Sequence, residues 1–401
     1  MQKKILIVVG IIILFLETCI TPTVAIDNIE QSPMPISNGK TLYVGGSGEG
    51  NYSKIQYAID NASDGDTVFV YDDSSPYYEN IKIGKSIELI GESKYSTVIN
   101  GNHTEDVIYI KENTSGGTIK GFTIKNSGNK KWEDAGIEIS GYFDSITDNI
   151  IINNWFGIAN LKYYSYVYGY CKKISNNIIT GNEVGICIDS FEDIFSKTDI
   201  YENFIANNSD GIIATYDGYS SLYIENRNNL YQNNITNNNH GIVISNEMYQ
   251  DIYNNNITDN QYGITLYSLH GICYKNNIYK NNIKRNICGL ELYNGCTSNT
   301  YENNIYLNNF INNNYSVIIK NDEYGFCPNG NNLYLNNFIN NKISAKIEPE
   351  NLWSMFSKNS WERNYWNRPR ILPKMVTSPH FILSLFNTDW HPALKPYDIG
   401  V

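Results

Sequence analysis

Acidic residues that recur along a repetitive sequence are the first candidates for chemistry. Asp217, Glu247 and Asp322 each stand six residues after a repeated anchor dipeptide, and Asp189 stands four residues after its own. Convergent carboxylates can act as a general acid and base or bind calcium. Alternatively, they form a solvated turn edge whose charge discourages aggregation. We expect the solvated edge and keep Asp189, Asp217 and Glu247 as candidate catalytic or calcium-binding residues.

Tyrosine is the second residue type that suggests a site, because 33 of the 401 residues are Tyr. Tyr164, Tyr166 and Tyr168 alternate along the chain, and Tyr216 and Tyr219 belong to a second cluster. Alternation places rings on the same side of a strand or extended loop. Such a platform can stack on sugar rings while its hydroxyls hydrogen-bond. The alternative is that these rings shield the flank of the fold.

The elements that position these side chains come from a repeat. Its copies are anchored by Gly157, Gly185, Gly211, Gly241, Gly263 and Gly289, with Ser316 in the next copy, at intervals of 22 to 30 residues. Three and eight residues before each anchor stands an Asn, and six residues before it stands an apolar residue such as Ile235, Ile257 or Ile283. A unit this short cannot bury its apolar residue alone, so the copies must stack.

Short alternating runs predict strands in each copy, as in residues 241–245 and 263–267. With no room for a crossover helix, each coil adds one strand to each parallel sheet. About 60 residues are Asn, and this residue tolerates left-handed backbone at turns and can form side-chain ladders along a stack. The sequence therefore predicts an all-β, right-handed parallel β-helix, a solenoid of about ten coils.

The expected boundaries follow from where this pattern starts and stops. Residues 27–66 are predicted to form a linker and a short capping helix with Ser53 as its N-cap, residues 67–345 the β-helix, and residues 346–401 a C-terminal cap or tail. The cap is expected to be irregular and aromatic, because it contains Trp353, Phe356, Trp361, Tyr365 and Trp366.

The first 26 residues predict export, because two Lys precede an apolar run at residues 5–16 and small residues follow it. Whether the segment is cleaved or kept as an anchor stays open. The run is shorter than a bilayer requires, and no membrane span is expected in the mature chain. A net charge of −11 without a basic stripe argues against nucleic acid as a partner. Sequons for N-glycosylation stand at Asn51, Asn61, Asn102, Asn113, Asn207, Asn234, Asn256 and Asn314.

Six cysteines follow Cys19, at Cys171, Cys187, Cys273, Cys288, Cys296 and Cys327. Their spacings match no zinc or redox motif. Buried thiols and one or two disulfides both stay open.

With these features in place, the chain resembles the parallel β-helix repeat proteins grouped with NosD in the pectin-lyase-like superfamily, especially exported archaeal members. The matching stretches are residues 43–46, 55–70, 78–81 and 87–91, the Asn-Asn-Ile coils, and residues 364–366. The resemblance covers nearly the whole mature chain and implies the fold. It does not select an activity, because the superfamily includes lyases, hydrolases, epimerases, adhesins and noncatalytic surface proteins.

For lyases, the resemblance implies carboxylate-bound calcium and an Arg or Lys base. Residues 118–345 contain only Arg227 and Arg285, neither beside an acidic cluster in the sequence, so a lyase is disfavoured. Hydrolases of the superfamily use closely placed Asp residues, and the Asn-Thr-Asp at residues 387–389 lies beyond the predicted coils. NosD is linked to copper delivery, but the five His residues are scattered, so copper is not expected.

We therefore expect a noncatalytic, secreted or cell-surface β-helix that binds polysaccharide or envelope glycans and requires no cofactor, although calcium is compatible with the carboxylates. One alternative is a carbohydrate-active enzyme, a polysaccharide hydrolase or lyase. A further alternative is a NosD-like periplasmic copper-handling protein. The sequence leaves the ligand and the oligomeric state open.

Overall fold

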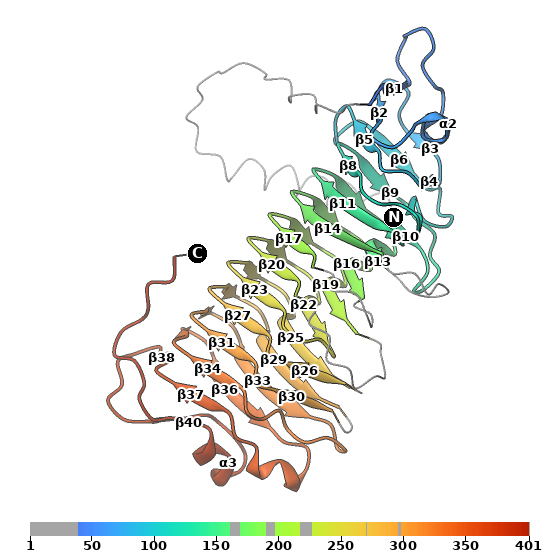
Figure 1. Ribbon diagram of the computed structural model, residues 1–401. Coiled ribbons are helices and arrows are strands. Elements are labelled where there is room, and N and C mark those ends of the chain that lie inside the picture. Colours follow the sequence, from blue (N-terminus) through green and yellow to red (C-terminus); the bar gives the residue numbers. More distant parts are fainter. Residues whose placement is uncertain are drawn as a thin grey trace, which may run out of the picture. The chain divides into compact units, whose positions relative to one another are not determined.

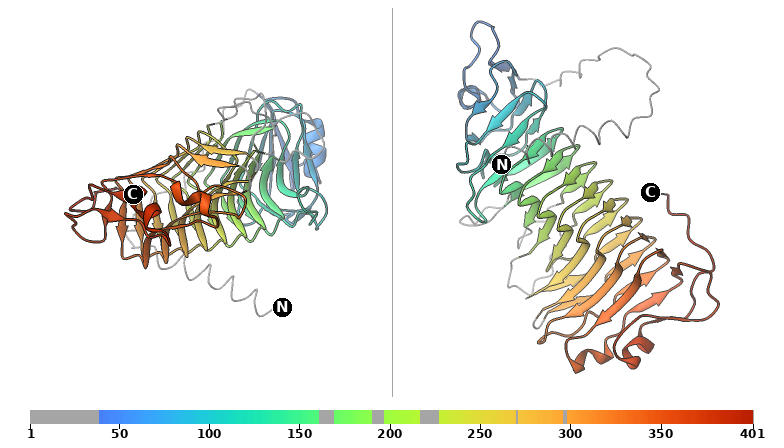
Figure 2. Two further views of the ribbon diagram at one scale, coloured as in Figure 1. Left: turned by 90° about the horizontal axis from the view of Figure 1, so that it is seen from below. Right: turned by 180° about the vertical axis from the view of Figure 1, so that it is seen from behind.

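The repeat copies form short strands that stack in three parallel sheets (Figure 1). The computed structural model describes residues 39–160, 169–189, 197–216, 227–269, 271–295 and 298–400. The described residues form an all-β solenoid of right-handed type with about 11 turns, seen from below and from behind in Figure 2. The predicted parallel β-helix of about ten coils is confirmed.

Each sheet takes one strand from successive coils. The 13-stranded sheet contains, in spatial order, β1 (Thr41–Val44), β2 (Thr67–Val70), β5 (Glu88–Gly91), β8 (Thr118–Lys120), β11 (Tyr142–Thr147), β14 (Tyr170–Ser175), β17 (Asp199–Tyr201), β20 (Asn229–Tyr231), β23 (Asp251–Tyr253), β27 (Asn277–Tyr279), β31 (Asn304–Tyr306), β34 (Asn332–Tyr334) and β37 (Ser360–Glu362). The 12-stranded sheet contains β3 (Tyr77–Tyr78), β6 (Val98–Asn100), β9 (Thr123–Lys125), β12 (Ile150–Ile152), β15 (Ile178–Thr180), β18 (Phe204–Ala206), β21 (Asn234–Thr236), β24 (Asn256–Thr258), β28 (Asn282–Lys284), β32 (Asn309–Ile311), β35 (Asn337–Ile339) and β38 (Tyr365–Trp366). The 11-stranded sheet contains β4 (Ile81–Ile83), β7 (Ile108–Ile110), β10 (Ala135–Ile139), β13 (Phe156–Asn160), β16 (Val184–Asp189), β19 (Asp210–Thr215), β22 (His240–Ser245), β25 (Tyr262–Ser268), β29 (Cys288–Asn294), β33 (Tyr315–Asn321) and β36 (Ile343–Glu348).

Smaller elements complete the described chain. Strands β26 (Ile272–Tyr274) and β30 (Asn299–Tyr301) form a parallel pair, and β39 (Lys374–Met375) and β40 (Thr388–Asp389) form an antiparallel pair. The helices are α2 (Ile55–Asn61), the 3₁₀ helix η1 (Leu352–Phe356) and α3 (Phe381–Phe386). Among the described residues, no helix has the length and hydropathy needed to cross a membrane. The predicted export segment at residues 1–26 lies outside the described residues.

The apolar residue of each copy lies in one interior column. Ile235, Ile257 and Ile283 pair in register across β21, β24 and β28, and all three are fully buried. The repeated glycines lie beside this column. A Cβ on Gly211 would lie 2.5 Å from the carbonyl oxygen of Gly241 in the next coil. This close approach between coils explains why glycine recurs at the anchors.

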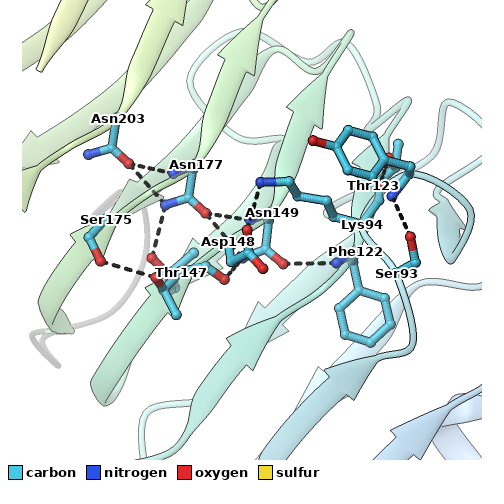
Figure 3. A network of polar contacts seen from close by, with 12 residues as sticks. Ser93, Lys94, Phe122, Thr123, Thr147, Asp148, Asn149, Ser175, Asn177 and Asn203 are labelled. Carbon is cyan, nitrogen blue, oxygen red and sulfur yellow. Dashed lines mark hydrogen bonds and ion pairs between the residues drawn. The ribbon is translucent and has the colours of Figure 1, made fainter. Parts of the chain in front are cut away.

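Asparagine side chains form ladders along the interior turns. In the first ladder, Asn177 Oδ1 accepts hydrogen bonds from the backbone N–H of Asn149 at 3.0 Å and from its side-chain amide at 3.2 Å (Figure 3). The Asn177 amide in turn donates to Asn203 Oδ1 at 3.1 Å and to the carbonyl of Ile146 at 2.9 Å. Each rung thereby satisfies the polar atoms that stacking would otherwise bury unpaired.

The described coils contain three such ladders, two of which the sequence predicts. The first runs through Asn149, Asn177, Asn203, Asn233, Asn255, Asn281, Asn308, Asn336 and Asn364. The second runs through Asn154, Asn182, Asn208, Asn238, Asn260, Asn286, Asn313 and Asn341. The third, not predicted, runs through Gln250, Asn276, Asn303, Asn331, Asn359 and Asn387. Where a coil has both, the second-ladder Asn stands five residues after the first-ladder Asn. From Gln250 to Asn359 the third-ladder residue stands five residues before the first-ladder Asn, so the same spacing predicts it.

The left-handed backbone lies at a different position from the ladder side chains. The residue directly before a ladder Asn has positive φ, as at Asn153 (57°), Glu202 (56°) and Leu307 (53°). The prediction that turn asparagines supply this conformation is therefore only partly right. Because Glu and Leu also occupy it, we infer that the ladder bonds hold the turn open against the steric cost at these residues.

Helix α2 covers the first coil as predicted, but its N-cap is different. Lys54 is the N-cap residue, and it makes no side-chain cap hydrogen bond. The Glu79 carboxylate instead accepts hydrogen bonds from the backbone N–H groups of Ile55 at 2.9 Å and Gln56 at 3.0 Å. A carboxylate from the next coil satisfies the helix N-terminus, so Ser53 is not needed as a cap.

The sheets extend beyond the predicted 67–345 range at both ends, through β1 at the start and through β37 and β38 at the end. Trp361 and Trp366, predicted to belong to an irregular plug, are buried in these last strands, and Trp366 stacks on Phe338 at 4.5 Å between ring centroids. An aromatic rung can continue the interior column because its flat ring stacks on the ring beneath it. Trp353 and Phe356 in η1 are exposed.

Candidate functional site

A groove of about 470 Å³ lies on the outer side of β4, β7 and β10, near the N-terminal end of the solenoid. These strands come from three successive coils, so residues far apart in the sequence meet there. The groove is lined by Asn80, Ile81, Lys82, Glu105, Asp106, Tyr109, Glu112, Lys130, Trp132, Glu133, Asp134, Glu138 and Ser140.

The floor of the groove is a row of three chemically different side chains. Lys82, Tyr109 and Glu138 pair in register across β4, β7 and β10. The isoleucines on either side of each are buried in the core, so strand alternation turns these three outward. Neighbouring strands lie about 4.8 Å apart. A cation, a phenol and a carboxylate therefore follow one another along the groove, where Lys82 is exposed, Tyr109 is half-buried and Glu138 lies deepest, with 5% of its surface exposed.

Asp106 stands two residues before β7, and its Oδ1 accepts a hydrogen bond from the backbone N–H of Ala135 at 2.7 Å. Burial raises the pKa of Asp106 to about 7, helped by the nearby carboxylates of Asp134 and Glu105 and opposed by the Ala135 N–H and by Lys82. Near neutral pH this carboxyl can either donate or accept a proton. That property is the one a general acid or base requires.

The Tyr109 hydroxyl donates a hydrogen bond to Glu112 Oε1 at 2.7 Å. Burial raises the pKa of Tyr109 to about 12, so the phenol stays neutral. The same hydrogen bond lowers the pKa of Glu112 and keeps it charged. Tyr109 and Glu112 thus form a fixed donor and acceptor pair in the groove.

Trp132 supplies an aromatic ring to the groove. It lies on the segment before β10, its φ is 66°, and 44% of its surface is exposed. Its ring packs against Phe156 with centroids 5.7 Å apart. Other bulky residues of this chain, such as Tyr249 and Leu335, also adopt left-handed φ, so what distinguishes Trp132 is that its exposed ring lines the groove together with the carboxylates.

The groove is strongly acidic, with six carboxyl groups and two lysines among its lining residues. Lys130 is paired with Glu133 at 3.5 Å. Within the described ranges, no group of three or more His, Cys, Asp or Glu side chains is placed to hold a metal ion. The groove therefore favours neutral or cationic ligands that present hydroxyl or ammonium donors.

Sequence reasoning missed this groove because its coils carry weak asparagine signals. The available signal was the coil period itself, since Lys82, Tyr109 and Glu138 are separated by 27 and 29 residues.

The carboxylates singled out from the sequence lie elsewhere, and those described do not converge. Asp189 ends β16 and registers with Thr215 of β19. Glu247 lies two residues after the end of β22, is 4% exposed, and accepts a hydrogen bond from the Gln250 amide at 3.3 Å. Asp322 accepts two backbone hydrogen bonds in its own turn. Asp217 lies outside the described residues.

Four of the five predicted platform tyrosines, Tyr164, Tyr166, Tyr168 and Tyr219, also lie outside the described residues. Tyr216 directly follows β19, and its backbone N–H donates to the carbonyl of Ser245 at 3.1 Å. The structure therefore gives no geometry for a sugar platform built from the predicted set.

A different tyrosine column, not predicted, lies on the outer face of the 13-stranded sheet. Adjacent rings stack with centroids 5.0 to 5.1 Å apart and interplanar angles of 4° to 9°. Ring faces in contact with one another are not open to a sugar ring, so this column presents ring edges and hydroxyls instead. The column consists of Tyr201, Tyr231, Tyr253, Tyr279, Tyr306 and Tyr334.

The predicted sequons are all in the described chain. Six of the eight asparagines are exposed, namely Asn61, Asn102, Asn113, Asn207, Asn234 and Asn314. Asn51 and Asn256 are half-buried, and the Asn256 amide donates to Asn234 Oδ1 at 3.1 Å. Modification at Asn234 or Asn256 would break that contact.

The five described cysteines, Cys171, Cys187, Cys273, Cys288 and Cys327, are buried free thiols. Burial raises the pKa of Cys171 and of Cys273 to about 12. These two thiols are poor nucleophiles and poor metal ligands as they stand.

Two family descriptions match the chain. "Protein of unknown function (DUF1565)" matches residues 26–240, and "Periplasmic copper-binding protein (NosD)" matches residues 215–326. Within the described part of the second range, His240 pairs with Asp210 at 2.7 Å and stacks on Tyr262. Among curated proteins there is no significant match.

Solved structures to which the chain is similar include the following three. The complex structure of XylC with xylose has a TM-score of 0.56 at 12% identity, covering 89% of this chain and 86% of that one. The A-modules of the Azotobacter vinelandii mannuronan C-5 epimerases AlgE6 and AlgE4 have TM-scores of 0.48 and 0.42 at 15% identity. The AlgE6 alignment covers 77% of this chain and 92% of that module. The AlgE4 alignment covers 85% of this chain and 94% of that module. At these identities the XylC similarity shows the fold alone.

Proposed function

Because the chain belongs to the family described as "Protein of unknown function (DUF1565)", which supplies no activity, we propose a function from the groove. The protein is an exported carbohydrate-binding protein. Its groove on β4, β7 and β10 holds a neutral or amino-sugar glycan.

The observation that carries this proposal is the combination of Trp132 with the row of Lys82, Tyr109 and Glu138. An exposed aromatic ring stacks on the C–H face of a pyranose, while carboxylates accept hydrogen bonds from its hydroxyls. Ligand sites typically join such an apolar surface to a few fixed polar groups. The tyrosine column on the 13-stranded sheet lacks open ring faces and is a weaker candidate.

The charge of the groove selects the class of sugar. Six carboxyl groups against two lysines would repel the carboxylates of a polyuronate. Neutral hydroxyls and protonated amines would instead find acceptors at Glu112 and Glu138. The structure of XylC with xylose offers a precedent for a sugar bound by a protein of this fold.

The direct test is a binding measurement on matched oligosaccharides that are neutral, amino-substituted or uronic. We expect the wild type to bind the first two classes and not the third. Trp132→Ala and Glu138→Gln should each weaken binding at least about tenfold, the loss of one stacking or charged hydrogen-bond contact. Tyr95→Ala is the matched control, because Tyr95 is 73% exposed and does not line the groove. Unchanged affinity in both groove variants, or binding of uronic chains only, would overturn the proposal.

A second candidate function is hydrolysis of the bound glycan, favoured by the pKa of about 7 at Asp106. A glycosidase needs a protonated carboxyl near the glycosidic oxygen and a second carboxylate opposite it. Asp106 would donate the proton, and Glu138 is the candidate second group. Incubation with the glycan that binds, followed by reducing-end analysis, tests this role. If turnover is seen with wild type and retained by Asp106→Asn, Asp106 is not the acid; if none is seen, the protein binds without catalysis.

A further inference from the structure

The C-terminal end of the solenoid exposes an unusual amount of apolar surface. Eleven of the twenty large apolar side chains that are exposed in the described chain lie within residues 352–394. Seven of them belong to η1 and α3, which contact each other, with the rings of Phe356 and Phe386 6.4 Å apart. We call these seven the C-terminal apolar patch: Leu352, Trp353, Phe356, Phe381, Ile382, Leu385 and Phe386.

Hydrogen bonds anchor helix α3, which carries four of the patch residues. The Asn387 amide donates to the carbonyl of Leu383 at 2.9 Å, and the Thr388 hydroxyl donates to the carbonyl of Ser384 at 2.9 Å. Asn387 is itself the last rung of the third ladder, so α3 is tied to the end of the stack. Of the α3 residues, only Leu383 and Ser384 are buried. The other large side chains of α3 are therefore not needed to cover the last coil, because they remain exposed.

Such a cap departs from what solubility alone would favour. A terminal repeat normally presents a polar outer face, yet here Trp353 is 78% exposed and Phe381 is 71% exposed. An exposed apolar patch of this kind on a folded protein marks a docking surface.

Charge indicates what docks there. Residues 351–400 contain six Lys and Arg and three Asp and Glu, a net charge of +3, whereas the whole chain carries −11. One of the three acids, Asp389, is buried. Lys358 and Arg368 are both exposed, and Lys358 lies two residues after the end of η1. The described end of the solenoid is thus both apolar and basic on an otherwise acidic protein.

We propose that the C-terminal apolar patch docks on the surface of a membrane that contains anionic lipids. Aromatic and aliphatic side chains enter the interfacial layer, while neighbouring Lys and Arg contact lipid phosphates. Two copies meeting cap to cap would bring two positive ends together, which disfavours a homotypic contact. Leu, Ile and Phe side chains offer a glycan no hydrogen bonds, which disfavours a sugar ligand.

Docking at this end would hold the groove away from the lipid. In the 11-stranded sheet, β10 is eight strands from β36, or about 40 Å at the usual strand spacing. Figure 1 shows α3 at one end of the stack and β4 near the other. The groove on the flank of the solenoid would then be separated from the lipid surface by most of the length of the stack.

The test uses the full chain and two kinds of vesicle, phosphatidylcholine alone and an equimolar mixture with phosphatidylglycerol. We expect sedimentation with the mixed vesicles, and at least tenfold weaker binding of the Trp353→Ser, Phe356→Ser, Phe381→Ser triple variant. The matched control replaces three exposed tyrosines elsewhere, Tyr78, Tyr95 and Tyr324, with Ser. Because residues 1–38 are the same in every variant, a contribution from them cancels in the comparison.

Two further measurements separate the outcomes. Lipids brominated in their acyl chains should quench fluorescence in the wild type more than in Trp353→Phe, which places Trp353 in the interface. Lys358→Gln with Arg368→Gln should reduce the preference for anionic vesicles. Equal vesicle binding by the wild type and the triple variant would overturn the proposal. So would a wild-type dimer in analytical ultracentrifugation that the triple variant loses while neither protein binds vesicles.

Discussion

Asp389 stands where the next asparagine of the first ladder would stand, directly beyond Asn364. Its Oδ2 accepts hydrogen bonds from the backbone N–H of Asn364 at 2.9 Å and from the Asn364 side-chain amide at 3.3 Å. The indole N–H of Trp366 donates to the same oxygen at 2.9 Å. A carboxylate suits this rung, because the described residues form no further coil beyond it that would offer an oxygen to an amide N–H. The Asn-Thr-Asp at residues 387–389, considered above as a hydrolase motif, closes two ladders instead.

Removing this last rung should loosen the end of the stack. Asp389→Ala leaves three buried donors of Asn364 and Trp366 unpaired, and we expect it to destabilise the last coil by about 3 kcal/mol. Asp389→Asn keeps one acceptor oxygen and should cost about 1 kcal/mol. Hydrogen exchange by mass spectrometry, compared between residues 359–389 and the central coils, measures the effect. Equal protection in the alanine variant and the wild type would show that the rung does not hold the cap.

An interior rung should matter much more than an outer asparagine beside it. Asn255 is fully buried and its amide donates to Leu230 O at 2.7 Å and to Asn281 Oδ1 at 3.0 Å. Its Oδ1 also accepts from Asn233, so Asn255→Ala should lower the free energy of unfolding by about 4 kcal/mol. Asn256→Ala, the matched control on the outer face, should cost less than about 1 kcal/mol. Chemical denaturation of protein made without glycosylation compares them, and similar losses would argue against the ladder.

The tyrosine column should act on stability through its stacked rings. Tyr253 lies 5.0 Å from Tyr231 and 5.0 Å from Tyr279, measured between centroids. Tyr253→Phe keeps both stacked pairs and should change the free energy of unfolding by less than about 0.5 kcal/mol, whereas Tyr253→Ala loses both and should cost about 2 kcal/mol. Thermal melts measure this difference. Neither variant should alter glycan binding, and a loss of binding in Tyr253→Ala would move the site to this face.

Asp106 should make stability depend on pH. Its folded pKa of about 7 lies above the ordinary value of 3.8, so the folded state binds a proton that the unfolded state has released between these values. The contribution of Asp106 to the free energy of unfolding is fully present below about pH 4. It is lost as the pH rises to 7 and above, by up to about 4 kcal/mol. Asp106→Asn should therefore match the wild type at pH 4 and exceed it at pH 8. Urea denaturation across this range checks the sign, and parallel curves for the two proteins would contradict it.

How far the sequence predicts this protein depends on whether the repeat controls the feature in question. The anchors and their flanking asparagines predict the interior column through Ile235, Ile257 and Ile283, because a residue at a fixed place in every coil must lie above its counterpart. The same reasoning predicts two ladders. It misses the third, although from Gln250 to Asn359 the third-ladder residue stands five residues before the first-ladder Asn. It also misplaces the left-handed residue by one position. Spacing alone does not show that the ladder Asn supplies the side chain while the residue before it adopts the positive φ.

The sequence by itself determined the fold class, the core and most of the ladders, because these follow from a local period that every coil repeats. Only the tertiary structure decided which nonrepeating residues meet. Lys82, Tyr109 and Glu138 become neighbours through strand register, and Asp106 acquires its raised pKa through burial and the nearby carboxylates of Asp134 and Glu105. The cap is similar, since the position of Asn387 and Asp389 on the last rungs depends on how residues 367–386 loop back. Register and burial are properties of the stack, and no single stretch of sequence contains them.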